Sequence, residues 1–158
     1  MRPFHTLAGF LLVVALSSGA CDSSPNSDIT APTEVTFSLA DLAEILFARG
    51  APIEVGDEEV VEFLPIPVRH ITVFGEDVLV LEFVGPNTAA AFASTISSDG
   101  TTVNGRVIDW PATPHFFLSG QVIALYLGND LSTISALQEI MGPQFAGGEV
   151  DFTVEGAS

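Results

Sequence analysis

Residues 69–96, RHITVFGEDVLVLEFVGPNTAAAFASTI, contain the clearest structural pattern of the chain. The first part alternates polar and apolar residues up to a turn at Gly75, and a longer apolar run follows it. Pro86 then opens an alanine-rich segment, as it commonly does at the first position of a helix. The stretch therefore predicts a unit of two strands and a helix.

The same order recurs in residues 115–140, HFFLSGQVIALYLGNDLSTISALQEI. Here Gly120 supplies the turn between two apolar runs, and Asp130 caps a segment with helical spacing that ends at Gly142. The chain thus contains an internal repeat, in which Gly75 and Gly120 are expected to occupy equivalent hairpin turns.

A helix is also predicted ahead of the repeat, over Leu39–Arg49. Ser38 and Asp41 form a short capping-box variant, and Gly50 supplies the stop. Between this helix and the repeat we expect two short edge strands, residues 53–55 and 60–64, separated by a turn at residues 56–59.

The predicted order is helix, hairpin, helix, hairpin, helix, within a single domain of residues 34–148. This order favours an α+β fold, with a four-stranded antiparallel sheet and the helices on one face. In each repeat unit the second strand, VLVLEFV or VIALYL, is apolar on both faces. This indicates either that the two strands are covered on both sides or that the sheet offers an apolar surface to a partner. We expect burial. In the tail, residues 149–158, the stretch 149–155 alternates polar and apolar side chains. It predicts a fifth, edge strand, with a frayed end as the alternative.

The first residues have the layout of a signal peptide over residues 1–20. A single Arg2 precedes ten residues, Leu7–Leu16, that are apolar apart from one glycine, a run too short to span a bilayer. The chain's single cysteine, Cys21, directly follows Ser18-Gly19-Ala20, and this arrangement resembles the lipobox of bacterial lipoproteins. The resemblance implies cleavage before Cys21 and lipid attachment to its thiol, and so an anchor in the membrane of the cell envelope. An ordinary secretory peptide cut near Ala20 is the alternative.

Residues 22–33, rich in Ser, Asp and Pro, then predict a flexible stalk that carries the domain outside the cytoplasm.

Composition excludes several classes of function. The chain of 158 residues has 20 acidic and 4 basic residues, a net charge of -16, so it lacks the cations that nucleic-acid binding requires. A single cysteine excludes a disulfide framework and a Cys-rich zinc site. With 47% hydrophobic residues the chain should nevertheless fold around a core.

Two histidines, His70 and His115, each stand five residues before a turn glycine, which suggests equivalent positions where they could face one another. A metal site would need further ligands such as Glu62 or Asp109, and no short ligand spacing supplies them. We therefore expect structural histidines, no metal and no cofactor. The acidic residues 57–62 also lack the spacing of a calcium loop.

The enzyme hypothesis depends on Asp109, His115 and Ser119, which are the residue types of a hydrolase triad. Ser119 lies at a hairpin turn without a nucleophile-elbow pattern, so we expect no enzyme activity and no catalytic residue, and keep a small hydrolase as the alternative. Trp110, His115 and Phe116 are candidate binding residues, because aromatic rings can form a ligand platform; packing in the core is the competing interpretation.

Several stretches of the second half resemble a family of small exported bacterial proteins without an assigned activity. These are ISSDG at residues 96–100, PHFF at residues 114–117, VIALYLGND ending at Asp130, and MGPQFAG at residues 141–147. The resemblance covers residues 69–148 and implies export and fold only. The expected function is a lipid-anchored, non-catalytic binding or interaction module with an unknown protein or small ligand; an inhibitor or chaperone-like module is a further alternative.

Overall fold

The computed structural model describes residues 36–149 and begins with helix α1, Leu39–Ala48. The predicted capping box is present: the Ser38 hydroxyl accepts a hydrogen bond from the Asp41 backbone N–H, and the Asp41 carboxylate accepts one from the Ser38 N–H at 2.8 Å. Gly50 follows the helix with a φ of +76°, the left-handed conformation that glycine adopts without strain. These local signals fix both ends of α1 as the sequence predicts.

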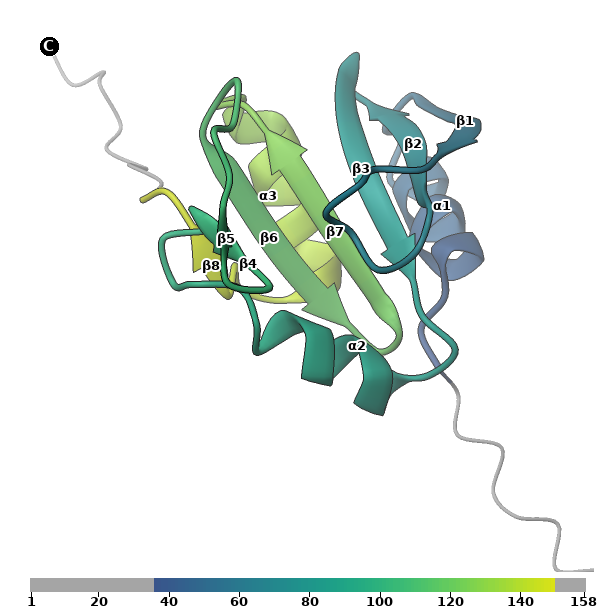
Figure 1. Cartoon of the computed structure of the whole chain (residues 1–158). Helices are drawn as coiled ribbons and strands as arrows, with labels where there is room; N and C mark the ends of the chain where they lie inside the picture. Colours follow the sequence, from purple (N-terminus) through teal and green to yellow (C-terminus); the bar gives the residue numbers. More distant parts are fainter. Residues whose placement is uncertain (1–35, 150–158) are drawn as a thin grey trace, which may run out of the picture. The chain divides into compact units, whose positions relative to one another are not determined.

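The main sheet has six antiparallel strands in the order β1-β2-β3-β7-β6-β8 (Figure 1). Their bounds are β1 Ile53–Glu59, β2 Val68–Val73, β3 Glu76–Glu82, β6 Pro114–Ser119, β7 Val122–Leu127 and β8 Ala146–Gly147. A separate ribbon contains β4 Thr102–Val103 and β5 Arg106–Val107, and the other helices are α2 Pro86–Ala93 and α3 Leu131–Met141. The α+β class is confirmed. The predicted four-stranded sheet forms the middle of a wider one, because β1 and β8 extend it at the two edges.

Strand β1 departs from the prediction of two short strands and a turn. It is continuous through residues 56–59, and the predicted strand at residues 60–64 is wrong. Val55 pairs with Ile71 and Glu58 pairs with Arg69, so β1 holds one extra residue, a β-bulge. A Cβ on Gly56 would lie 3.3 Å from the His70 carbonyl oxygen, so glycine suits this close approach of the two strands. The bulge therefore occupies the place of the expected turn.

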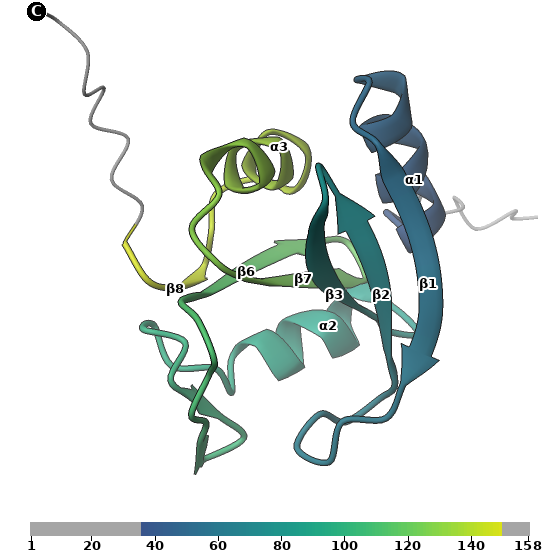
Figure 2. The same ribbon diagram turned by 90° about the horizontal axis from the view of Figure 1, so that it is seen from above.

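The helices lie on both faces of the sheet, which corrects the prediction that they share one face. Helices α1 and α3 lie on one side and α2 on the other (Figure 2). The reason is the composition of the sheet: the side chains of Val122–Tyr126 in β7 are all at most 1% exposed, so both faces need apolar cover. The first core contains Leu42, Leu46, Ile71, Val78, Phe117, Tyr126, Ile134 and Leu137. The second core contains Leu81, Phe83, Phe92, Phe116, Ile123 and Leu125.

Gly75 and Gly120 both lie in hairpin turns, as predicted, but the expectation that their positions are equivalent is wrong. The β2–β3 loop is Phe74-Gly75, and both residues have positive φ angles, 53° and 89°. The β6–β7 loop is Gly120-Gln121, with the glycine, at φ 55°, in first place. The two hairpins are therefore offset by one residue when they are aligned on their glycines.

The longest helix of residues 36–149 is α3, with 11 residues, and no helix in this part of the chain is long and apolar enough to cross a bilayer. The expectations for the signal peptide, for Cys21 and for the stalk fall outside the described residues. So does the predicted strand of the tail from residue 150 onward.

Candidate functional site

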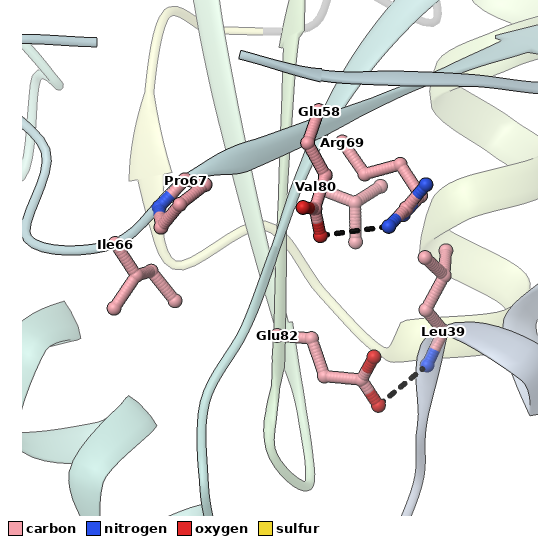
Figure 3. Close-up of a pocket in the computed structure, with 7 residues that line it drawn as sticks. All are labelled: Leu39, Glu58, Ile66, Pro67, Arg69, Val80 and Glu82. Atoms are coloured by element: carbon pink, nitrogen blue, oxygen red, sulfur yellow. Dashed lines mark hydrogen bonds and ion pairs between the residues drawn. The ribbon is translucent and has the colours of Figure 1, made fainter. Parts of the chain in front are cut away.

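A groove of about 280 Å³ lies beside α1, where strands β1, β2 and β3 meet the loop that leads into β2. Its lining comes from distant parts of the chain and combines charged side chains with apolar ones (Figure 3). The lining residues are Leu39, Glu58, Ile66, Pro67, Arg69, Val80 and Glu82.

One wall of the groove is an ion pair across the β-bulge. Arg69 Nη2 lies 2.7 Å from Glu58 Oε1, and Arg69 Nη1 donates to the Gly56 carbonyl oxygen at 3.3 Å. The bulge creates this arrangement because it shifts Glu58 into register with Arg69. The guanidinium is thus held by β1 on two sides.

The opposite wall carries the carboxylate of Glu82. Its Oε1 accepts hydrogen bonds from the Leu39 backbone N–H at 3.3 Å and from Gln121 Nε2 at 3.0 Å. Both donors are uncharged, and no ion pair joins Glu82 to a cation within residues 36–149. Glu82 therefore keeps an uncompensated negative charge beside the groove.

The apolar part of the lining is fixed by strand periodicity. Val80 and Glu82 lie two residues apart in β3 and so share one face of the sheet. Val80 is 1% exposed and pairs with Arg69 across the strands, while Leu39 from α1 and Ile66 from the loop add further apolar surface. The accessible apolar surface of the groove therefore comes from Leu39, Ile66 and Pro67, and it lies beside the two carboxylates.

The electrostatic field around the groove is negative. The arginines of the described residues are Arg49, Arg69 and Arg106, and each lies within 4 Å of a glutamate oxygen. Since the whole chain has a net charge of -16, these pairs leave a large excess of carboxylates. Such a surface attracts cations and repels anions.

His70 lies on the other face of the sheet from the groove, between two carboxylates. Its Nδ1 is 2.9 Å from Asp77 Oδ2 and its Nε2 is 3.0 Å from Glu59 Oε2. Burial alone would lower the pKa of His70, but the hydrogen bonds and negative charges of Asp77 and Glu59 outweigh it, so the pKa is raised. This cluster joins the edge strand β1 to β2 and β3.

His115 is fully buried among protein groups. Its Nδ1 lies 2.6 Å from Gln144 Oε1, its Nε2 lies 3.0 Å from the Gly128 carbonyl oxygen, and its ring stacks on Tyr126 with centroids 6.1 Å apart. His115 belongs to the α1 and α3 face, whereas His70 belongs to the α2 face. The expectation that the two histidines could face one another is wrong, because a one-residue offset between the hairpins moves a side chain to the opposite face.

The residues of the hydrolase hypothesis are not brought together by any hydrogen bond among residues 36–149. Both ring nitrogens of His115 are engaged by Gln144 and Gly128. Ser119 lies four residues further along β6, about 13 Å away at the usual strand rise. Asp109 is exposed in the loop before β6.

The aromatic candidates are divided between the two faces. Trp110 packs against Phe116, with ring centroids 6.0 Å apart, and its Nε1 donates to the Gly100 carbonyl oxygen at 2.8 Å. Phe116 is 1% exposed. The side chain of His115 lies on the opposite face of the sheet from Phe116. Of the three predicted binding residues only Trp110 is partly exposed, and ligand binding by them stays a prediction.

Sequence reasoning missed Glu58, Arg69 and Glu82 as a site. One signal for it exists in the sequence: Glu82 is the charged residue in the apolar strand VLVLEFV. Residues 36–149 contain no group of three His, Cys, Asp or Glu side chains arranged to hold a metal ion.

Comparisons of the chain with protein-family models, with curated proteins and with solved structures find no match. We therefore infer its function from its own residues and their geometry.

Proposed function

We propose that the chain is an exported bacterial lipoprotein, anchored through Cys21, whose α+β domain is a non-catalytic binding module at the cell envelope. The N-terminal sequence supports the export and the anchor, since a short apolar run ends directly before the chain's single cysteine. The resemblance to small exported bacterial proteins supports the same location.

The observation that carries the binding role is the groove between α1 and the strands β1 to β3. It combines the apolar surface of Leu39, Ile66 and Pro67 with two carboxylates. Arg69 holds Glu58, and the Leu39 N–H and Gln121 hold Glu82. The polar part of its lining is larger than the apolar part, and fixed polar groups of this kind give a binding site its orientation and specificity. Catalysis has weaker support, because the two ring nitrogens of His115 are already engaged inside the fold.

The location is tested by the variant Cys21→Ala. Acyl chains contribute about 0.8 kcal/mol for each buried methylene, so the wild-type protein should appear in the membrane fraction. The variant should move to the soluble fraction or accumulate as unprocessed precursor. A wild-type protein that partitions into detergent while its intact mass shows an unmodified Cys21 contradicts the proposal.

The binding role is tested in intact cells with a photo-crosslinking residue placed at Ile66, which lines the groove. The same residue placed at Asn87, exposed on α2, is the matched control. We expect one defined adduct, identified by mass spectrometry, from position 66 and not from position 87. Identical products from both positions, or none from position 66, would argue against a binding module that works through this groove.

A further inference from the structure

We propose that the groove binds a basic side chain, lysine or arginine, presented by an extended segment of a partner protein. This inference rests on the proposed binding function and names the chemistry of the partner. It is carried by two features of the described residues: the arrangement of the groove lining and the position of β1 at the edge of the sheet.

The lining matches the two parts of a basic side chain. Leu39, Ile66 and Pro67 offer accessible apolar surface to the methylene stem, as amphipathic side chains require. The charged end would then lie between Glu58 and Glu82, which line the groove from opposite walls. In Figure 3 the Glu58 carboxylate is directed toward Arg69 and the Glu82 carboxylate toward the Leu39 N–H.

Glu82 is the carboxylate that a cationic ligand would neutralise. Its carboxylate accepts hydrogen bonds from two uncharged donors, the Leu39 N–H and the Gln121 amide. A carboxylate offers about four acceptor sites in all, so it can still accept from a cation. Glu58 already has Arg69 at 2.7 Å, and one additional cation in the groove would balance the second of the two carboxylates.

An anionic ligand fits this groove poorly. Arg69, the one cation among the described lining residues, is already paired with Glu58 and donates to the Gly56 carbonyl oxygen, so its charge is compensated before an anion arrives. An anion would also approach Glu82 and a domain with a large excess of negative charge. The charge distribution therefore favours a cation.

The segment that presents the side chain has a place beside the groove. Strand β1 is the terminal strand of the sheet, next to β2, and it contributes Glu58 to the lining. An extended segment can add to a terminal strand through main-chain hydrogen bonds. The exposed acidic side chains of β1, Glu54 and Asp57 among them, discourage pairing with a second copy of this chain and favour a segment of opposite charge.

The test is a titration of the whole chain, purified in detergent, with two acetylated and amidated peptides, one alternating threonine with lysine and one alternating threonine with glutamine. Binding is measured by calorimetry and by amide chemical shifts at about 0.15 M salt, where the Debye length is about 8 Å and distant charges are screened. We expect the lysine peptide to bind and to shift the amides of Leu39, Arg69 and Val80. The glutamine peptide should not bind.

Glu82→Gln keeps the size of the side chain and removes its charge, and should weaken binding of the lysine peptide about tenfold. Glu44→Gln, at an exposed position of α1 outside the groove, makes the same change in net charge and should weaken it less than about twofold. Circular dichroism checks that both variants are folded, and the shift map of the wild-type protein locates the peptide independently of either variant.

Equal losses in the two variants would mean attraction to net charge only and would overturn the proposal, as would the absence of binding or shifts confined to another surface. These failures are distinguishable from a failure of the proposed function. If the peptide does not bind while the crosslinker at Ile66 captures a defined partner in cells, the binding role stands and the basic chemistry of the partner is wrong.

Discussion

Two mutant cycles test the assignment of α2 to the opposite face of the sheet from α1. Phe83, just after β3, and Phe92 of α2 are 6% and 7% exposed, and their ring centroids are 5.5 Å apart. Leu46 of α1 is 0% exposed and belongs to the core on the other face. The substitutions Phe83→Leu, Phe92→Leu and Leu46→Val reduce these contacts without large cavities.

The contact geometry sets the expected free energies. Each single variant should lose roughly 1 kcal/mol of unfolding free energy, as modest changes of shape in a core do. Aromatic pairs at this spacing contribute about 0.5–1.5 kcal/mol beyond their buried area, so Phe83→Leu with Phe92→Leu should cost less than the sum of the single changes by that amount. Leu46→Val with Phe92→Leu should be additive to within about 0.5 kcal/mol, because the sheet separates the two residues.

The assay is urea unfolding of each variant followed by circular dichroism. Unfolding free energies are compared only between variants whose free energy falls with urea at the same slope. A different slope would show that the substitution has changed the unfolded state. A coupling above about 0.5 kcal/mol between Leu46 and Phe92, together with none between Phe83 and Phe92, would refute the two-sided arrangement and restore the one-sided packing expected from the sequence.

Three further predictions concern single residues. The pKa of His70 is raised in the folded protein, so the folded state favours the protonated imidazole. This stabilisation is fully present below the ordinary pKa of 6.5 and is lost as the pH rises through the pKa of His70 in the folded protein. His70→Gln should therefore lose more unfolding free energy at about pH 5.5 than at about pH 8.5, and equal losses would contradict the role of its two carboxylate neighbours. Gly128→Ala would place a Cβ 2.6 Å from Cζ of the buried Tyr126, so it should lower the unfolding free energy by roughly 1–3 kcal/mol, whereas an unchanged urea midpoint would contradict this packing. Ser38→Ala removes the acceptor for the Asp41 N–H and should cost about 1 kcal/mol in the same assay; a loss too small to measure would mean that α1 does not depend on its cap.

The elements that the sequence predicts well are those encoded by neighbouring residues. The capping pair Ser38 and Asp41 and the stop at Gly50 define α1, while Pro86 and Asp130 mark the beginnings of α2 and α3. Each signal acts within one turn of a helix, so it needs no knowledge of the tertiary fold. The α+β class follows from the order of these elements.

The side of the sheet on which each helix packs is not encoded in this local way. The helix periodicity of α2 shows that one stripe of it is apolar, and that stripe can cover either face of an apolar sheet. The burial of β7 on both faces is the physical reason for two layers, since three helices on one side would leave Phe116, Ile123 and Leu125 exposed. The sequence contains this information only as the lack of a polar face in VIALYL.

The histidines show how a one-residue difference changes the meaning of a repeat. Spacing measured from the turn glycines places His70 and His115 at equivalent positions, but Gly75 is the second residue of its loop and Gly120 is the first. A positive φ at Phe74 makes this shift possible. Strand side chains alternate between faces, so the two imidazoles point to opposite sides, one among carboxylates and one in the core.

The groove was beyond sequence reasoning for a related reason: its two carboxylates come from strands that are not neighbours, and the bulge in β1 sets their relation. Glu82 alone was visible as a charge within an apolar strand, and a buried-strand interpretation gives no reason for it. In the structure it is the exposed last residue of β3, where its carboxylate accepts from the first backbone N–H of α1. The position of the charge at the rim of the core lets one strand serve packing at Val80 and ligand recognition at Glu82, two residues apart.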